Sequence, residues 1–489
     1  MKTSKLFAAA SAMVLALGAS ACDSGLTEIN ENPNDPEVVP ADNVFANGVS
    51  SAVNRAFGAN FNATLTGLWA QHLAKIQYID EDRYDLRDQA VNNHWTGFYS
   101  VPLNDFQDVV NSGKNNNRPN VEAQGLVMRS WLFQILTDVW GDIPYSEALR
   151  GTGEARIVTP KYDTQEAVYN GILADLKRAN DIVGAGVAVE DGDLIYGGDM
   201  PSWKKFANSL RLRAAMRLSN VNPTLARTEA AAAIAAGVFT SNDDNAILHY
   251  TSSAPSQSPI YLNQLGYGGQ RDDHGVAATM VNTLKGLNDP RLAVYAQPAP
   301  GDKQYRGAPS GPADKDAAVL NTISRLGEYF LQADWPAPLM TYAEVLFLRA
   351  EAAQRGWVAG DAAALYNAGI RASLEMYESD AGQQLISEAS IAAYLAQPSV
   401  AYNGLTSIWT QKWIALFMNG PEAYAEVRRT NTPTLTPASG SIIGPKIPVR
   451  IFYPTNEESY NKENLQAAVA RNGGQGIPEG MLTPLWWDK

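Results

Sequence analysis

The stretch of sequence that decides the fold is 338–377, PLMTYAEVLFLRAEAAQRGWVAGDAAALYNAGIRASLEMY. In its first half, side chains that suit a buried helix face recur every three or four residues, at Leu339, Tyr342, Leu346, Ala350, Ala353 and Trp357. Gly356 and Gly360 then interrupt this pattern, and Asp361 can cap a second helix that continues to Tyr377. A connection of about five residues makes two such helices antiparallel. The stretch therefore predicts a helical hairpin of the tetratricopeptide type, although the full consensus of that repeat is absent.

Similar pairs of helical segments occur elsewhere, at 104–111 with 121–140, 164–183 with 202–218, and 405–418 with 421–429. Between about 240 and 335 the residues Ser, Gly, Pro, Asp and Gln dominate, which predicts long loops around a few short helices. Long ordered loops of this kind are usually binding elements. We also expect a short strand at 446–453. The sequence thus predicts a mainly α-helical fold of hairpins, with a loop-rich ligand-binding insertion and few short strands.

The N-terminus has the pattern of an export signal. Lys2 and Lys5 precede an apolar segment at 6–17 that is too short to span a bilayer, and small residues lead from it to Cys22, the only cysteine. This order resembles a bacterial lipoprotein signal, in which the cysteine carries acyl chains such as palmitate; an ordinary secretory signal is the alternative. We expect a signal peptide at 1–21, a lipidated polar tether at 22–40 and the folded body at 41–489.

The composition excludes several functions. The chain has 489 residues, of which 45% are hydrophobic, so it can bury a large core without disulfides. Its net charge of -13 repels phosphate backbones, and we expect no nucleic-acid partner. One cysteine and four histidines without ligand spacing predict no metal site and no cofactor. Common catalytic motifs are absent as well, so we predict no catalytic residues; a surface glycosidase with a carboxylate pair stays an alternative.

Aromatic residues indicate where a ligand could bind. The 11 Trp and 21 Tyr outnumber the 13 Phe, and Trp and Tyr rings offer a flat face to sugar C–H groups and a polar edge to hydroxyls. One group lies in a polar stretch that also carries Arg83, Asn92 and Asn93, and a second lies in or beside the loop-rich insertion. The predicted ligand-binding residues are Trp69, Tyr78, Tyr84, Trp95 and Tyr99 from the first group, and Tyr261, Tyr267 and Trp335 from the second.

A series of short motifs extends along nearly the whole chain. These motifs are Asn30, Asn32, Pro33 and Asn34 after the cysteine, then Asn288-Asp289-Pro290-Arg291, Trp335-Pro336, Pro338 to Val345, Arg349 to Ala352, Tyr366 to Ile370, Gln411-Lys412-Trp413, Arg428-Arg429-Thr430, Pro448-Val449-Arg450, Tyr453-Pro454 and Leu485-Trp486-Trp487-Asp488. In this order they resemble the SusD/RagB family of nutrient-binding lipoproteins. We expect most of these residues to be structural, with Glu344, Arg349 and Glu351 in charge or cap contacts and Arg291 bracing a turn.

The resemblance implies the SusD-like fold, an α-helical body on tetratricopeptide-like hairpins with a loop-rich face for ligand. It also implies a lipid-anchored protein on the outer surface of the outer membrane. Such a protein caps a SusC-like TonB-dependent transporter and delivers an oligosaccharide, or a peptide, for import, and it catalyses nothing itself. A tetratricopeptide-like scaffold that binds only a protein partner remains the alternative.

Overall fold

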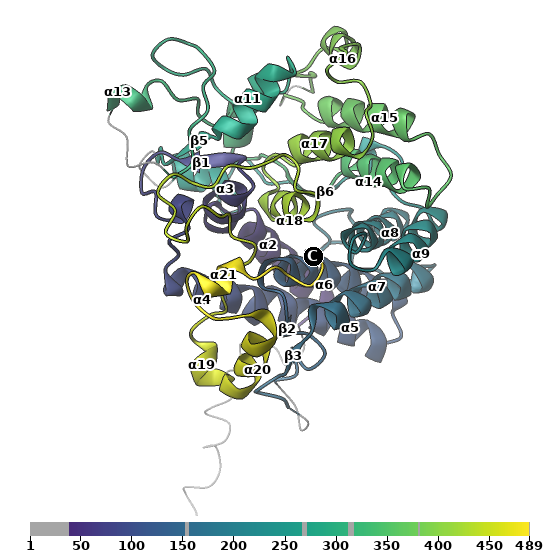
Figure 1. Ribbon diagram of the computed structural model, residues 1–489. Helices are drawn as coiled ribbons and strands as arrows, with labels where there is room; N and C mark the ends of the chain where they lie inside the picture. The colour runs from purple at the N-terminus through teal and green to yellow at the C-terminus, as the bar shows by residue number, and fades with distance from the viewer. Residues whose placement is uncertain (1–38, 152–155, 267–270, 312–316, 380–381, 489) are drawn as a thin grey trace, which may run out of the picture. The chain divides into compact units, whose positions relative to one another are not determined.

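The computed structural model describes residues 39–488 apart from 152–155, 267–270, 312–316 and 380–381. The predicted signal peptide at 1–21, Cys22, the tether up to residue 38 and Tyr267 lie outside the described residues. All the elements below belong to the unit Ala41–Lys489. They are mainly helices, as the sequence predicts (Figure 1).

The long helices form hairpins at all the places that the sequence predicts. Figure 1 shows α5 to α9 on the lower right and α14, α15 and α17 above them. Helix α9 (Pro223–Ala236) extends the second hairpin by packing on α8, and α6 packs on α7, which joins the first two hairpins. The hairpins are α5 (Asn104–Asn115) with α6 (Pro119–Trp140), α7 (Gln165–Ile182) with α8 (Met200–Arg217), α14 (Tyr342–Gln354) with α15 (Ala362–Glu375), and α17 (Leu405–Ala415) with α18 (Gly420–Thr430).

The α14–α15 hairpin differs from the prediction at its start. The expected helix begins at Pro338, but strand β6 (Ala337–Met340) occupies these positions and the helix follows it. Thr341 explains this boundary, because its hydroxyl oxygen accepts a hydrogen bond of 3.3 Å from the backbone N–H of Glu344 and so caps the helix. Asp361 caps α15 in the same way, as predicted.

The strands of the described residues are few and short, as expected, and they form antiparallel pairs. They are β1 (Leu73–Lys75) with β5 (His274–Val276), β2 (Ile143–Pro144) with β3 (Tyr162–Asp163), and β4 (Ala246–Leu248) with β6. The predicted strand at 446–453 is wrong. The backbone amide of Val449 donates to the carbonyl of Met481 and that of Ile451 to the carbonyl of Val139, so single hydrogen bonds to helical elements hold this segment in place of a strand ladder.

The loop-rich insertion is also confirmed. Its β4 pairs with β6 just before α14, and its β5 pairs with β1 in the N-terminal part of the chain, so both sheets tie the insertion to the helical body. Its helical turns are short: η5 (Asn242–Asp244), α10 (Pro259–Tyr261), η6 (Leu262–Gly266), α11 (Ala278–Gly286), α12 (Leu292–Tyr295), α13 (Ala317–Leu320) and η7 (Glu328–Leu331).

The remaining elements lie at the two ends of the described chain. The C-terminal ones are α16 (Glu388–Leu395), α19 (Glu457–Tyr460), α20 (Lys462–Asn472) and α21 (Glu479–Leu482). The N-terminal ones are α2 (Ala41–Ala56), η2 (Ala59–Thr66), α3 (Gly67–Trp69), η3 (Glu81–Arg83), α4 (Asp88–Phe98) and η4 (Tyr99–Leu103). Helix α2 packs against α5 and against η2, and so connects the first hairpin to the elements that form the groove described below.

A network of buried ion pairs joins the hairpins. It includes Arg213 with Glu344 at 2.6 Å, Arg217 with Glu422 at 2.5 Å, Lys412 with Glu426 at 3.1 Å, and Arg429 with Glu351 at 2.6 Å and with Glu426 at 2.5 Å. The prediction of charge pairs is therefore confirmed for Glu344 and Glu351. Arg291 braces its turn as expected, because its guanidinium donates hydrogen bonds to both carboxylate oxygens of the buried Asp289.

Candidate functional site

A polar groove lies where the end of α2, η2 and α4 meet the α10–η6 turn of the insertion. Its main part has a volume of about 660 Å³, and an adjoining part has about 260 Å³. Both parts are lined by Asn60, Asn93 and His94, so they form one continuous depression. Volumes of this size are typical of sites for small ligands. We call this depression the amide groove, because Asn54, Asn60, Asn93, Asn263 and Gln89 line it.

Irregular helical turns shape the amide groove. Within the described residues, π-helical turns occur at η2, η4 and η6, and each of these three elements contributes lining residues. A π-turn inserts an extra residue into a helix and turns a side chain away from its regular position, and such turns are frequent at functional sites. Asn60, Ser100 and Asn263 come from these turns, whereas the lining residues Asn54, Arg55, Asn93 and His94 come from the regular helices α2 and α4.

The carboxamides give the groove its chemistry. Each Asn or Gln side chain offers both hydrogen-bond donors and an acceptor, which suits hydroxyl and acetamide groups. Asn54 accepts a hydrogen bond of 2.9 Å from the hydroxyl of Tyr250, and Gln89 donates one of 2.7 Å to the Oδ1 of Asn93. The amide nitrogen of Asn93 and both polar atoms of Asn60 have no hydrogen-bond partner among the described residues, so they are available to a ligand.

His94 and Arg55 set the electrostatics of the groove. Burial, together with the positive charge of Arg55, lowers the pKa of His94 to about 4, so the imidazole is neutral at pH 7 and carries one donor and one acceptor. Arg55 makes no ion pair with a described residue, and its guanidinium lies directly over Gly97. A Cβ atom at Gly97 would lie 2.0 Å from Nη1 of Arg55, so a larger residue at this position would displace the guanidinium.

The predicted aromatic residue Tyr78 lies on the connection between β1 and α4, the helix that lines the amide groove. Tyr78 follows β1 and is 63% exposed. The guanidinium of Arg271 lies 5.7 Å from the centre of its ring, because the pairing of β1 with β5 brings the two segments together. Arg271 in turn forms a 2.6 Å ion pair with Asp273. The ring of Tyr78 thus stands at the surface with one cationic neighbour.

Other predicted residues of the first group face the interior. Trp69 packs edge-on against Tyr84 and Tyr424, and the hydroxyl of Tyr84 accepts a hydrogen bond from the backbone N–H of Ala438. Trp95 is 5% exposed, and the half-buried Tyr99 contacts it and donates a hydrogen bond of 2.8 Å to the carbonyl of Pro144. These four rings lie beneath the surface, where they offer little area to a ligand.

The second group is divided between two places. Tyr261 is half-buried on α10, directly before the lining residues Leu262 and Asn263 of the amide groove. Trp335 is buried and lines a separate cavity. The structure therefore brings Tyr261 close to the amide groove and leaves Trp335 apart from it. Tyr267 is outside the described residues.

The sequence analysis did not select Asn54, Arg55, Asn60, His94 and Asn263, although all of them line the groove. A signal is present in the sequence of η2 and its surroundings, where Asn54, Asn60 and Asn62 cluster around Gly58. Asn92 and Arg83, which it did consider, make structural contacts instead: Asn92 donates to Thr455, and Arg83 donates to the carbonyl of Gly440.

None of the helices in the described part of the chain combines the length and the apolar character of a membrane span. The described residues also contain no cluster of three or more His, Cys, Asp or Glu side chains that could hold a metal ion.

Comparisons with known proteins agree with one another. The sequence model of a family described as SusD-like, starch-binding and associating with the outer membrane matches residues 33–454. A structure of a chitin-binding protein is 31% identical, with a TM-score of 0.81, and the match covers 92% of this chain and 100% of that one. A chitin-binding SusD homologue from Flavobacterium johnsoniae is 28% identical, with a TM-score of 0.79 and coverage of 91% and 98%. A SusD homologue from Bacteroides fragilis is 27% identical, with a TM-score of 0.78 and coverage of 92% and 100%. A search of curated protein sequences returned no match.

Proposed function

The chain belongs to the SusD-like family of starch-binding proteins that associate with the outer membrane, and on this premise we propose that it binds an oligosaccharide at the cell surface for uptake. In this proposal the signal peptide 1–21 is removed, Cys22 is lipidated, and the polar tether 22–40 connects the lipid to the folded body. The protein caps a SusC-like TonB-dependent transporter and hands the ligand over without catalysis.

The amide groove is the observation that carries the proposal. A neutral glycan presents hydroxyl and ether oxygens, and these need donors and acceptors without a strong net charge. Asn60 and Asn93 supply unoccupied amide groups, and neutral His94 supplies a further donor and acceptor. Tyr78 and Tyr261, with Tyr267 beyond the described residues, are the rings that we propose to stack on sugar faces.

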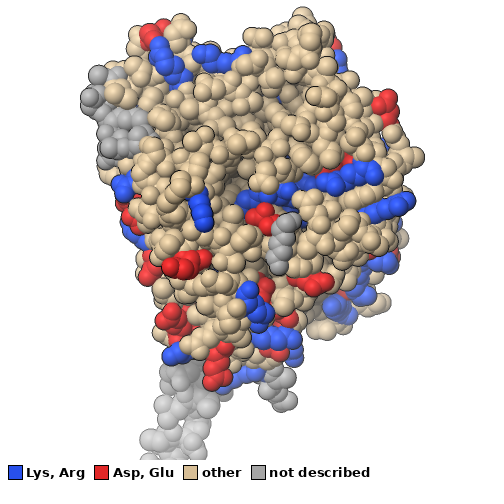
Figure 2. All heavy atoms as spheres, viewed as in Figure 1, with Lys and Arg blue, Asp and Glu red and all other residues tan. Residues whose placement is uncertain are grey.

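The surface charge supports a neutral ligand. On the face in Figure 2, lysine and arginine side chains of the described residues are interspersed with acidic ones, mostly over the lower part. The net charge of -13 adds to this argument against polyanionic partners. Because two structural neighbours are described as chitin-binding, oligomers of N-acetylglucosamine are the first ligands to test, and maltooligosaccharides are the second.

Calorimetric titration of the purified protein with both oligosaccharide series, and with a peptide mixture, tests the proposal. We expect a saturable signal with one glycan series and no product after long incubation. Replacing Asn60→Ala should raise Kd about tenfold, since a lost hydrogen bond costs about 1–1.5 kcal/mol.

Asn115→Ala is the matched control, because Asn115 is an exposed residue of α5 away from the groove and should leave Kd unchanged. A glycan that binds wild type and the Asn60→Ala variant equally would place the ligand elsewhere. Binding of peptide alone, or of a transporter without any glycan, would contradict the oligosaccharide assignment.

A further inference from the structure

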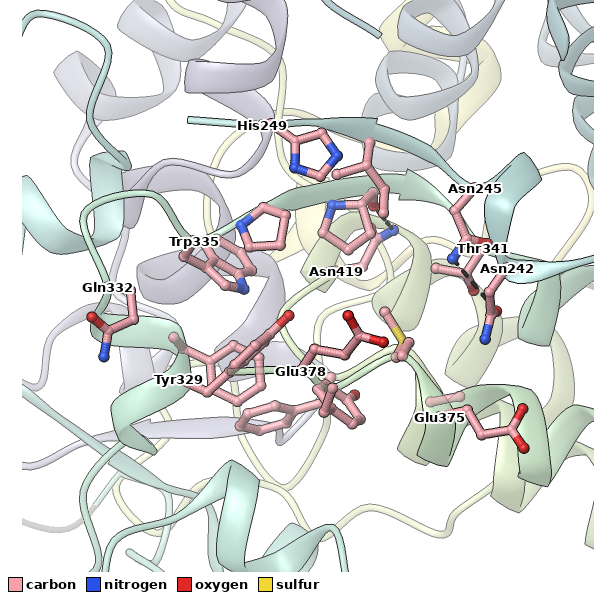
Figure 3. A pocket seen from close by; sticks show the side chains of 18 of the residues that line it. Asn242, Asn245, His249, Tyr329, Gln332, Trp335, Thr341, Glu375, Glu378 and Asn419 are labelled. Carbon is pink, nitrogen blue, oxygen red and sulfur yellow. Dashed lines mark hydrogen bonds between the residues drawn. The ribbon is translucent and has the colours of Figure 1, made fainter. Parts of the chain in front are cut away.

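A second cavity lies between β4, the η7–β6 connection, the residues after α15 and the end of α17 (Figure 3). Its volume is about 630 Å³, in the range of small-molecule sites. It shares no lining residue with the amide groove. We call it the acidic cavity, for the charges described next.

The charged residues that line this cavity are acidic: Asp243, Asp334, Glu344, Glu375 and Glu378, and no described lysine or arginine lies among the lining residues. Two of these carboxylates are already neutralised, Glu344 by Arg213 and Glu375 by Arg371. The other three form no ion pair with a described residue. A cavity with uncompensated carboxylates favours a cation over an anion.

Trp335 provides an independent observation that points to a ligand. The side chain is only 2% exposed and packs edge-on against Phe330 at 5.9 Å. Its indole N–H has no hydrogen-bond partner among the described residues, and Figure 3 shows the indole nitrogen facing the cavity. An indole N–H can only donate, and this one opens onto the cavity. An oxygen of a ligand in the cavity can therefore accept a hydrogen bond from Trp335.

Glu378 lies across the cavity from His249, and Figure 3 shows its carboxylate directed inward. The amide of Gln384 donates a 2.7 Å hydrogen bond to one carboxylate oxygen, which leaves the other oxygen available. Apart from the five carboxylates, the polar side chains that line the cavity are uncharged at pH 7. Burial, with the negative charge of Glu378, raises the pKa of Tyr329 to about 12, and burial lowers the pKa of His249.

We propose that the acidic cavity is a second ligand site, which binds an organic ammonium group that carries hydroxyl or ether oxygens, as a glucosamine unit does. The ammonium group lies against Glu378 and Asp334, and an oxygen of the same ligand accepts the hydrogen bond of Trp335. The half-buried ring of Tyr329 forms part of the cavity wall against the apolar side of the sugar. This assignment does not depend on the amide groove, because the two sites share no lining residue.

Calorimetric titration with a glucosamine tetramer, an N-acetylglucosamine tetramer and spermidine at pH 6 tests this site. We expect Glu378→Gln to raise the Kd for the glucosamine tetramer about tenfold, which corresponds to the loss of a charge-assisted hydrogen bond of about 1.4 kcal/mol. Trp335→Phe keeps an aromatic ring and should raise Kd about fivefold through the lost N–H donor. Binding should weaken as salt is added.

Glu166→Gln is the matched control, since Glu166 is an exposed acid on α7 that lines neither site. Asn60→Ala should leave glucosamine binding at the acidic cavity unchanged, which separates this proposal from that of the amide groove. Unchanged glucosamine affinity in both Glu378→Gln and Trp335→Phe would overturn the proposal. Spermidine that binds as tightly as the tetramer, and equally in Trp335→Phe, would overturn the amino-sugar assignment.

Discussion

Trp95 is surrounded by other aromatic rings. Its indole stacks on Tyr162 with ring centres 5.8 Å apart, and it meets Trp140 and Tyr453 edge-on. Trp95→Ala would leave a cavity that these rings cannot fill, so we expect the free energy of unfolding to fall by about 3–5 kcal/mol. Chemical denaturation measures this change.

Tyr78→Ala is the control for this prediction. Tyr78 is 63% exposed, so its truncation should change stability by less than about 0.5 kcal/mol. We expect the Tyr78→Ala substitution to lower glycan affinity instead, because the ring is proposed to stack on a sugar face. A Trp95→Ala variant as stable as wild type would show that the ring is not part of the core.

The two residues show why the sequence did not separate core rings from surface rings. Both Tyr78 and Trp95 lie in a polar stretch, and nothing nearby in sequence distinguishes them. The burial of Trp95 depends on Tyr453, which is distant in sequence, and the exposure of Tyr78 depends on the pairing of β1 with β5. Long-range contacts of this kind are not visible in local patterns.

At the scale of elements, the buried ion pairs between α8, α14, α17 and α18 should make stability sensitive to acid. Burial alone would raise the pKa of Glu426, but the charges of Arg429 and Lys412 outweigh it and hold that pKa well below the usual value. Because the folded pKa is depressed, this contribution to stability is complete above the unfolded value of about 4.3 and is lost as pH falls below it.

Glu426→Gln tests this dependence. The variant should be less stable at pH 7 by about 3–5 kcal/mol, since the buried Arg429 and Lys412 lose a partner, and its stability should change less between pH 5 and pH 3 than that of wild type. Thermal unfolding across this pH range measures both effects. Glu166→Gln should follow the wild-type curve, and a Glu426→Gln curve parallel to wild type would refute the argument.

The sequence predicted the helical elements better than the long-range contacts between elements. Apolar periodicity identified the hairpins, because each helix buries at least one face against its neighbour in the chain. The segment 446–453 has strand-forming residues but no strand beside it, and so no ladder forms. Glu351 pairs with Arg355 four residues later, which helical spacing can indicate, and with Arg429 of α18, which no pattern within α14 could indicate.

At the scale of the whole molecule, the same fold holds two cavities of different chemistry. The amide groove offers carboxamide donors and acceptors beside the cation of Arg55, and the acidic cavity offers uncompensated carboxylates. Both use residues of the insertion 240–335, and both also use residues of the helical body. A glycan that carries both acetylated and free amino groups therefore has functional groups that suit both cavities.

If Cys22 carries the lipid anchor, as proposed above, attachment to the membrane should depend on this residue and not on the folded body. We expect Cys22→Ala to move the protein from the membrane fraction to the soluble fraction without changing its melting temperature or its glycan affinity. Membrane fractionation measures this change. Cells that lack the proposed transporter, and a high-salt wash of the membranes, exclude attachment through a protein partner. Retention of the Cys22→Ala variant in the washed membranes would exclude the cysteine as the anchor. Loss of glycan binding in this variant would show that the N-terminal segment contributes to the ligand site.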